Sequence, residues 1–363
     1  MPQFRVIDSG VRDGRMQIAF DQALIDLHRA GRVPDTVRFL RFPPTVLIGR
    51  HQALSQEVKL EHVRDNGIGL VRRITGGGAI YLDEGQLGWE LVFRRSSLPL
   101  GTLADYTAKI CEAVATGLSA AFGIDARFRP RNDIEVDGRK LCGTGGFFDG
   151  DTLIYQGTVL IDMDPAAMVA CLNVPQAKLQ KRDLDSAANR VTTLKQLLGS
   201  APPVNVVQAA VLEGLRSSLG IVGEPQVISN AENAHAKEIF DDEIGQDSFV
   251  AEIDRPDGAG VLSGQQSGPG GTVTAYVRLE GPGRGDRIRE VLFTGDFFVT
   301  PPRLVFDLEA ALRGVPTAKA FSTVLAFFAN RTPDMLSIRP EDFAAAVGAA
   351  LGIEGAMSEP AGT

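Results

Sequence analysis

Three consecutive glycines at the end of a basic, β-prone segment are the densest chemical signal in the sequence. Residues 71–81 read Val-Arg-Arg-Ile-Thr-Gly-Gly-Gly-Ala-Ile-Tyr. Glycine lets a backbone approach a ligand closely and turn its N–H groups toward an anion. Because side chains alternate along a strand, Arg72 and Arg73 point to opposite faces, and only one of them enters a pocket easily. The triplet alone is equally typical of a flexible turn, but the flanking arginines favour an anion-binding loop.

A second signal is a β-hairpin predicted around Asp137-Gly138, a dipeptide typical of two-residue hairpin turns. Counted from this turn, the register places Glu135 opposite Lys140 and Asp133 opposite Cys142. One face is then apolar, and the other carries Asp133, Glu135, Lys140 and Cys142. A lysine and an aspartate so placed could hold a carboxylate or a phosphate with its magnesium ion. From the hairpin alone, an exposed salt-bridged pair of little energetic weight is the simpler interpretation.

The composition excludes several classes of protein. The 363 residues include 44% hydrophobic and 23% charged residues, which is typical of a globular protein with a sizeable core. A net charge of -8 argues against a protein that mainly grips nucleic-acid phosphates. The N-terminus lacks the pattern of a signal peptide, and no window approaches the ~18 apolar residues of a membrane helix. We therefore expect no nucleic-acid or membrane partner.

The cysteines and histidines are scattered rather than clustered. Cys111, Cys142 and Cys171 show neither the paired spacing of a disulfide scaffold nor the spacing of a zinc site, and the four histidines are equally dispersed. Cys111 and Cys171 lie in predicted helices, where a free cysteine usually packs as a small hydrophobic residue. This usage predicts a reduced, cytoplasmic protein.

The periodicity predicts an α+β chain with two units. In the first unit, residues 1–230, helices are predicted over 17–30, 103–122 and 204–219, and strands over 37–42, 45–48 and 69–73. The second unit, residues 231–363, is predicted to contain a strand over 249–253 and a flexible Gly/Pro/Ser-rich loop over 255–271. An antiparallel pair over 272–279 and 287–294 and helices over 304–313 and 340–351 are predicted to follow.

Several short blocks, taken together and in this order, resemble a known family. The chain resembles the lipoate-protein ligases, in the superfamily shared by biotin ligases and octanoyl transferases. The blocks are Met16–Asp21, Ile48–Gln52, Arg72–Ala79, Asn132–Ile134, Lys140, Gln156–Thr158 and Asn189–Leu194. Residues Val291–Phe298 also resemble the C-terminal accessory domain of the ligases, which simpler transferases lack.

The resemblance implies a fold and a reaction. The fold is a mixed β-sheet catalytic domain of the biotin/lipoate ligase type with a smaller α+β accessory domain. ATP with Mg²⁺ would activate lipoate or octanoate to an acyl-adenylate, and a lysine of a lipoyl-carrier protein would then take the acyl group. The implied carriers are a 2-oxoacid dehydrogenase E2 domain, the glycine-cleavage H protein or a specialised lipoate-binding protein.

The resemblance also implies roles for individual residues. Arg73 and Lys140 would be catalytic, because fixed cations offset the charge that gathers at the phosphorus centre. Asn132 and Asp133 would orient the nucleotide or its metal, with Asp133 as the Mg²⁺ ligand. Binding of lipoate and its adenylate would fall to Arg72, Thr75, Gly76, Gly77, Gly78, Ala79, Tyr81, Gly143, Thr144, Gly157 and Thr158.

Two departures from the family pattern leave alternatives open. Leu82 and Gln156 stand where many relatives have histidine, which excludes a histidine base at either position. An ATP-independent octanoyl transferase would use a cysteine thioester, and in the predicted register the Lys140 ammonium would favour the Cys142 thiolate. Against it, no cysteine stands just before Gln156, where one transferase branch carries its own. A non-catalytic lipoyl-binding protein is a third interpretation, although the chain retains Arg73, the glycines and Lys140.

Overall fold

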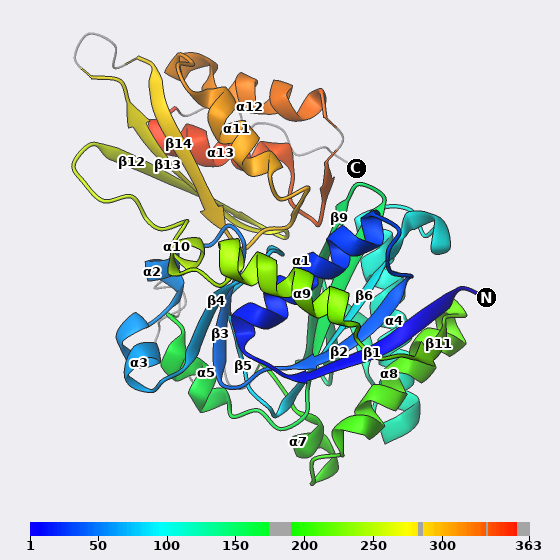
Figure 1. Cartoon of the computed structure of the whole chain (residues 1–363). Coiled ribbons are helices and arrows are strands. Elements are labelled where there is room, and N and C mark those ends of the chain that lie inside the picture. The colour runs from blue at the N-terminus through cyan, green and yellow to red at the C-terminus, as the bar shows by residue number, and fades with distance from the viewer. Residues whose placement is uncertain (174–189, 282–285, 332, 354–363) are drawn as a thin grey trace.

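The computed structural model describes residues 1–173, 190–281, 286–331 and 333–353. Asn189, which opens one of the blocks named above, lies outside the described residues. Two bodies make up the chain, a large N-terminal one and a smaller C-terminal one that lies against it (Figure 1). Each has its own apolar core. This is the α+β architecture that the sequence predicts.

The N-terminal body is built around an eight-stranded mixed sheet. Three neighbouring strands at one end run parallel, and every other neighbouring pair is antiparallel. In sheet order the strands are β11 (Val222–Pro225), β1 (Gln3–Val11), β2 (Thr36–Arg41), β6 (Gln86–Arg94), β10 (Thr152–Leu160), β9 (Arg139–Asp149), β8 (Asp133–Val136) and β7 (Arg127–Arg129). A smaller sheet has the order β4 (Gly69–Arg72), β3 (Thr45–Ile48) and β5 (Ile80–Leu82).

Helices cover the large sheet on both faces (Figure 1). Helices α4 (Leu103–Phe122) and α8 (Val204–Leu219) pack together on one face, and α1 (Gly14–Arg29) lies on the other. Asp13 caps the N-terminus of α1, and a glycine in the left-handed conformation, Gly123, ends α4. The long predicted helices are thereby confirmed. Short helices fill the connections: α2 (Leu54–Glu57), α3 (Leu60–Asp65), α5 (Pro165–Cys171), α7 (Leu194–Leu198) and the 3₁₀ turn η1 (Arg95–Ser97).

The C-terminal body is a three-stranded antiparallel sheet packed against helices. Its strands are β12 (Val261–Gly268), β13 (Gly271–Leu279) and β14 (Ile288–Gly295), and a two-stranded ribbon joins β15 (Val299–Thr300) to β16 (Asp334–Met335). Its helices are α11 (Leu304–Leu312), η4 (Thr317–Lys319), α12 (Ala320–Ala329) and α13 (Pro340–Leu351). The predicted antiparallel pair and both predicted helices of this unit are confirmed.

Three predictions for the region around residue 250 are wrong. The boundary predicted at residue 230 precedes α9 (Asn230–Ile239), which packs on α1, and the π-helix η3 (Phe240–Ile244) packs there too. Phe249, predicted to lie in a strand, belongs to helix α10 (Asp247–Val250) and to the core of the N-terminal body. The change from one core to the other therefore falls between Val250 and Val273. The loop predicted over 255–271 contains strand β12.

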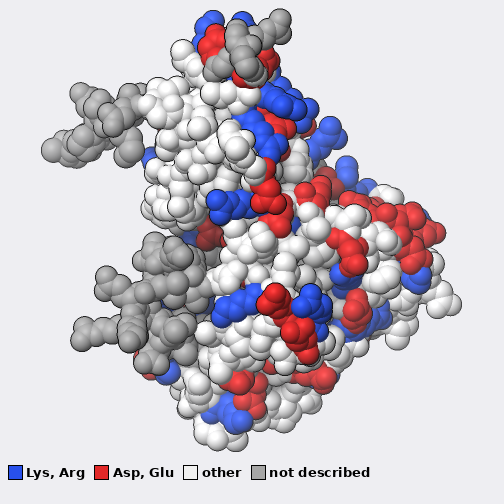
Figure 2. All heavy atoms as spheres, turned by 90° about the vertical axis from the view of Figure 1, so that its left-hand side faces the viewer, with Lys and Arg blue, Asp and Glu red and all other residues white. Residues whose placement is uncertain are grey.

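The surface carries mixed charge. On the face shown in Figure 2, the drawn Lys and Arg side chains lie among Asp and Glu side chains and do not merge into one continuous basic patch. None of the described helices is long and apolar enough to cross a membrane.

Candidate active site

The glycine loop lines a cavity of about 400 Å³ on the α1 side of the large sheet. The loop connects β4 to β5, so the small sheet holds it above strands β9 and β10. Almost all of the residues predicted for the site line this one cavity. They are Arg73, Thr75, Gly76, Gly77, Gly78, Ala79, Tyr81, Asn132, Asp133, Lys140, Gly143, Thr144, Gly157 and Thr158.

Arg72 is the exception. The two arginines point to opposite faces, as strand alternation requires. Arg72 is fully buried, and its guanidinium donates to main-chain carbonyls that include those of Gln52 and Ile253, both at 2.8 Å. Burial lowers the pKa of Arg72 to about 10. The predicted role of Arg72 in acyl binding is corrected to a structural one, since it joins the Gly49–Gln52 turn to the end of α10.

Arg73 points toward the cavity and shapes the loop. Its guanidinium donates to the carbonyls of Leu47, Gly76 and Gly78, each at 3.0 Å. By holding these loop carbonyls, Arg73 fixes the course of the loop along the cavity wall. Burial lowers the pKa of Arg73 to about 10, so the side chain still carries its charge at neutral pH. The loop thus has a fixed cation beside it, whose charge would favour an anion in the cavity.

The hairpin turn forms as predicted, but its register shifts by one residue. Asp137 (φ +50°) and Gly138 (φ +75°) form the turn, and Glu135 faces Lys140. A bulge then places Asp133 opposite Gly143 and Ile134 opposite Cys142. An extra residue in one strand sends the following side chains to the other face. Cys142 therefore does not share a face with Lys140, contrary to the prediction.

Lys140 is an accessible cation of the cavity. Its ammonium lies 2.8 Å from Asp133 Oδ1, and its side chain is 34% exposed. The backbone of Lys140 is held on its other side, because it donates to the carbonyl of Arg190 and accepts from the amide of Thr192, both at 2.8 Å. The block around Val191 thereby fixes the position of the lysine.

Asp133 acts as an ion-pair partner in this structure. Its second oxygen accepts a hydrogen bond from Arg129 at 2.8 Å. Although burial alone would raise the pKa of Asp133, the ammonium of Lys140 and the guanidinium of Arg129 lower it. With both oxygens paired to cations, the carboxylate does not fit the predicted role of Mg²⁺ ligand. No cluster of three or more His, Cys, Asp or Glu side chains that could hold a metal occurs among the described residues.

None of the three cysteines lines the cavity. Cys142 and Cys111 are completely buried in the core between the large sheet and α4. Burial raises the pKa of the Cys142 thiol, and it raises that of Cys111 to about 11. A thiol in such an environment is neither charged nor reachable. The expected core role of Cys111 and Cys171 is confirmed, and the same role extends to Cys142.

A buried network of four polar side chains, two of which line the cavity, was not part of the predicted site. Gln156 donates to Asp21 at 2.6 Å and to Glu90 at 2.8 Å, and Arg38 donates to the same two carboxylates at 2.6 and 2.9 Å. Asp21, Arg38 and Glu90 are completely buried. Burial, followed by the charge of Glu90, raises the pKa of Asp21 well above its usual range. Asp21 and Gln156 belong to two of the sequence blocks that resemble the family. Their presence in these blocks was the signal that could have pointed to a role in the site.

The remaining wall of the cavity is apolar. Trp89 lies beneath Gly157, where a Cβ atom would come within 2.2 Å of the indole, so only glycine fits. Leu82 stands where many relatives have histidine, and it belongs to the same apolar wall. Other apolar lining residues are Ile18, Leu40, Phe42 and Leu47. Such a wall suits a long aliphatic chain.

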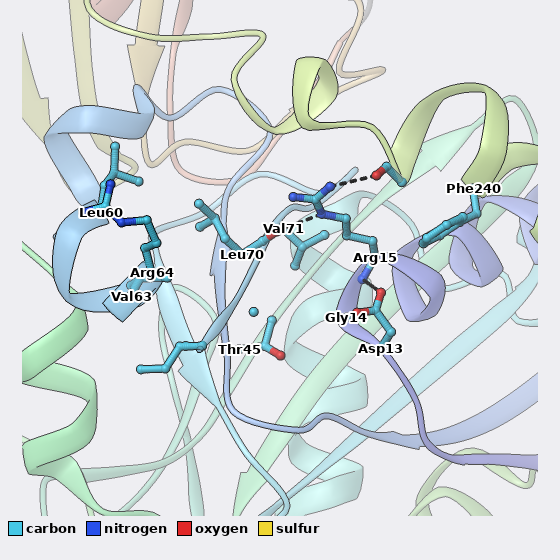
Figure 3. Close-up of a pocket in the computed structure, with 13 residues that line it drawn as sticks. Asp13, Gly14, Arg15, Thr45, Leu60, Val63, Arg64, Leu70, Val71 and Phe240 are labelled. Atoms are coloured by element: carbon cyan, nitrogen blue, oxygen red, sulfur yellow. Dashed lines mark hydrogen bonds between the residues drawn. The ribbon is translucent and has the colours of Figure 1, made fainter. Parts of the chain in front are cut away.

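A second hollow, of about 580 Å³, lies between α1, α3 and β4 (Figure 3). Its prominent cation, Arg15, is already bound to the carbonyls of Leu70 and Gly245 and to Asp247, at 3.1, 2.7 and 2.7 Å. None of the residues predicted for the site lines it. The candidate active site is therefore the cavity at the glycine loop.

The fold and the cavity define a class of protein, an α+β domain in which a glycine loop and a hairpin lysine meet at a largely apolar cavity. The family model for the lipoyl protein ligase A/B catalytic domain matches residues 13–216. The chain belongs to this family, whose members include lipoate ligases and octanoyltransferases.

Curated relatives come from both branches. The octanoyltransferase LipM of Halalkalibacterium halodurans is 26% identical over 279 residues, covering 69% of this chain and 99% of the relative. Lipoate-protein ligase A subunit 1 of Thermoplasma acidophilum is 30% identical over 237 residues, covering 62% of this chain and 88% of the relative.

Solved structures show the same fold. A bipartite lipoate-protein ligase of T. acidophilum, studied with its E2 lipoyl domain, matches with a TM-score of 0.62 at 26% identity, over 71% of this chain and 99% of that one. A lipoate-protein ligase A with bound ATP matches with a TM-score of 0.61 at 25% identity, over 69% and 99%. LipL1 of P. falciparum, at 15% identity, shares the fold over 92% of this chain and 95% of its own, with a TM-score of 0.71.

Proposed function

We propose that this protein is an ATP-dependent lipoate-protein ligase. It activates lipoate or octanoate to an acyl-adenylate and transfers the acyl group to a lysine ε-amino group of a lipoyl-carrier protein. The observation that carries the proposal is the composition of the cavity wall. A lysine and a glycine loop converge on the cavity, whereas none of the chain's three cysteines reaches it.

The first step joins two anions, and the cavity supplies the positive charge that this requires. An oxygen of the acid attacks the α-phosphorus of ATP, and pyrophosphate leaves. Lys140 is placed to stabilise the charge that builds on the phosphoryl oxygens, and Arg73 adds a fixed positive potential beneath the loop. Asn132 bonds to the backbone of Thr144, so its role is to hold the wall that the nucleotide contacts. Mg²⁺ would enter with ATP as its complex.

In the second step, the amine of the carrier lysine attacks the acyl carbonyl and AMP leaves. The Lys140 ammonium stabilises the oxyanion of the tetrahedral intermediate, which forms before AMP leaves. The ATP-bound lipoate-protein ligase A and the T. acidophilum ligase with its E2 lipoyl domain support ATP as the second substrate and a lipoyl domain as the acceptor. Because the reaction consumes ATP and the cysteines are unpaired, we place it in the reducing cytoplasm.

A second candidate function is octanoyl transfer without ATP. It is favoured by the LipM relatives, which match 69% of this chain or less. A transferase that works through Cys142 would require a buried thiol to leave the core, and the bulge turns that thiol away from the cavity. The ligase therefore agrees better with the structure.

The test is the intact mass of an apo lipoyl domain after incubation with the protein. One sample contains Mg-ATP with lipoate or octanoate, and the other contains octanoyl-carrier thioester without ATP. We expect an acyl mass gain in the first sample alone, and no gain in the first sample when ATP is omitted. A gain in the thioester sample alone would replace the ligase with the transferase. Binding of the acid with no gain in either sample, on several carrier domains, would indicate a non-catalytic lipoyl-binding protein.

A further inference from the structure

Asp133 is bound by two cations that come from different strands of the hairpin region. Arg129 ends strand β7 and stands opposite Asp133 in the register, whereas Lys140 belongs to strand β9. The Lys140 ammonium lies 2.8 Å from Asp133 Oδ1, and the Arg129 guanidinium donates to Oδ2, also at 2.8 Å. Each carboxylate oxygen therefore has its own cation. Of the two cations, only Lys140 lines the cavity.

Strand β9 leaves room for the lysine side chain to lie along it. A Cβ atom at Gly143 would be 2.5 Å from Lys140 Nζ and 2.6 Å from its Cε, so a side chain there would displace the ammonium. The Lys140 side chain is 34% exposed, and Asp133 is its only side-chain partner in the part of the chain that the structure describes. The ammonium is thus held by a single ion pair and is free to turn to a ligand in the cavity.

Such a turn leaves Asp133 with one cation instead of two. The Asp133 side chain is only 21% exposed, so water compensates its charge incompletely, and a half-buried carboxylate without a partner is unfavourable. Arg129 offsets this cost, because it stays on Oδ2 when the ammonium leaves Oδ1. A further ion pair, with Glu135 at 2.9 Å, holds the guanidinium in place. Two cations then face two carboxylates, and the cluster has no net charge.

We propose that Arg129 is a positioning residue that keeps Asp133 neutralised while Lys140 turns from this carboxylate to the ligand. The inference rests on the function proposed above, in which the Lys140 ammonium stabilises the phosphoryl oxygens and then the oxyanion. Arg129 does not line the cavity, so it acts through Asp133 and Lys140. Without the guanidinium, Asp133 would hold the ammonium more tightly, and a ligand would have to compete with a stronger ion pair.

The test is the affinity of the whole protein for a mimic of the acyl-adenylate. The probe is octanoyl-sulfamoyladenosine, which is not hydrolysed, and its dissociation constant is measured by calorimetry. Arg129→Met removes the second cation from Asp133, and we expect the probe to bind about three- to tenfold more weakly. Arg129→Gln, which keeps a donor but not the charge, should show the same loss. Because the Arg129 side chain is 39% exposed, both variants should melt close to the wild type.

Arg127→Met is the matched control for the loss of positive charge. Arg127 lies on the same strand, and its guanidinium pairs with Asp125 at 2.6 Å, so this variant removes an equal charge and leaves the partners of Asp133 in place. Its probe affinity should stay within about twofold of the wild type. Equal weakening by Arg127→Met and Arg129→Met would overturn the proposal, since charge on this strand would then be sufficient. So would a folded Arg129→Met protein with wild-type affinity.

A double-mutant cycle tests whether Arg129 acts through Asp133. Asp133→Asn removes the carboxylate that Arg129 neutralises, so adding Arg129→Met to it should change probe affinity by less than about twofold. A loss in this background as large as that of Arg129→Met alone would contradict the proposed role. If the wild-type protein binds no probe, the ligase function fails and the role of Arg129 with it. Probe binding that is insensitive to Arg129 removes the positioning role alone.

Discussion

The two faces of the eight-stranded sheet contain residues of the same strands and differ in almost every other respect. The face under α4 and α8 is a closed core, in which Cys111, Cys142 and Tyr155 are completely buried. The face under α1 carries the ion pairs of Arg38 and the cavity with Lys140. Alternation along a strand separates them, so a shift of one residue decides whether a side chain meets substrate or core.

Of the variants that test this difference between the two faces, we expect the largest effect, a loss of stability, at Arg38. This guanidinium neutralises two buried carboxylates, Asp21 and Glu90, for which Gln156 is the other side-chain donor in the described part of the chain. Arg38→Met removes the cation and leaves both carboxylates buried, which should lower the free energy of unfolding by about 3–5 kcal/mol. Urea unfolding followed by circular dichroism measures it. The matched control is Arg29→Met, an exposed partner of Asp149, with an expected loss of about 1 kcal/mol or less. If both variants lost the same free energy of unfolding, the buried network would stabilise the fold no more than an exposed ion pair does.

The second largest effect is expected at Lys140 and concerns the rate of catalysis. Lys140→Ala should lower the rate of ATP-dependent acyl transfer by about 10²–10³-fold, the usual cost of removing one stabilising donor. Its melting temperature should stay close to that of the wild type, because the side chain is one-third exposed. The control is Lys195→Ala, a similarly paired lysine away from the cavity. An active Lys140→Ala protein would exclude the lysine as the catalytic cation.

The smallest effect is expected on the core face. Cys142→Ala removes a buried sulfur and should cost about 1–2 kcal/mol of stability. The rate of ATP-dependent transfer should remain within about twofold of the wild type, because the thiol does not reach the cavity. If Cys142→Ala were stable but inactive, the thioester transferase would become the better hypothesis. The core face would then take part in catalysis as well.

Local signals in the sequence were sufficient for the long helices and for most of the site. Helices α4, α8 and α13 begin and end where their periodicity and their terminal glycines predict. The residues predicted around the glycine loop and the hairpin meet in one cavity, apart from Arg72. These features depend on the spacing of residues within short segments, and this spacing can be read directly from the sequence.

The errors have long-range causes. Strand β12 looks like a loop because it is rich in glycine and serine, yet Gly264 is required where the strand crosses α13. A Cβ atom there would lie 2.1 Å from the backbone of Ala350. The bulge near Leu141 depends on how the hairpin joins the rest of the sheet. Phe298 entered the site only through the docking of the accessory domain. No single segment contains such information.

The place of Trp89 in the cavity wall has a practical consequence. It is the only tryptophan of the chain, and it is completely buried below Gly157, at the surface that an acyl chain would cover. Its fluorescence therefore comes from one known point, and a ligand entering the cavity changes the polarity around a single emitter. Titration of the unlabelled protein with a fatty acid thus reports occupancy at the apolar end of the cavity.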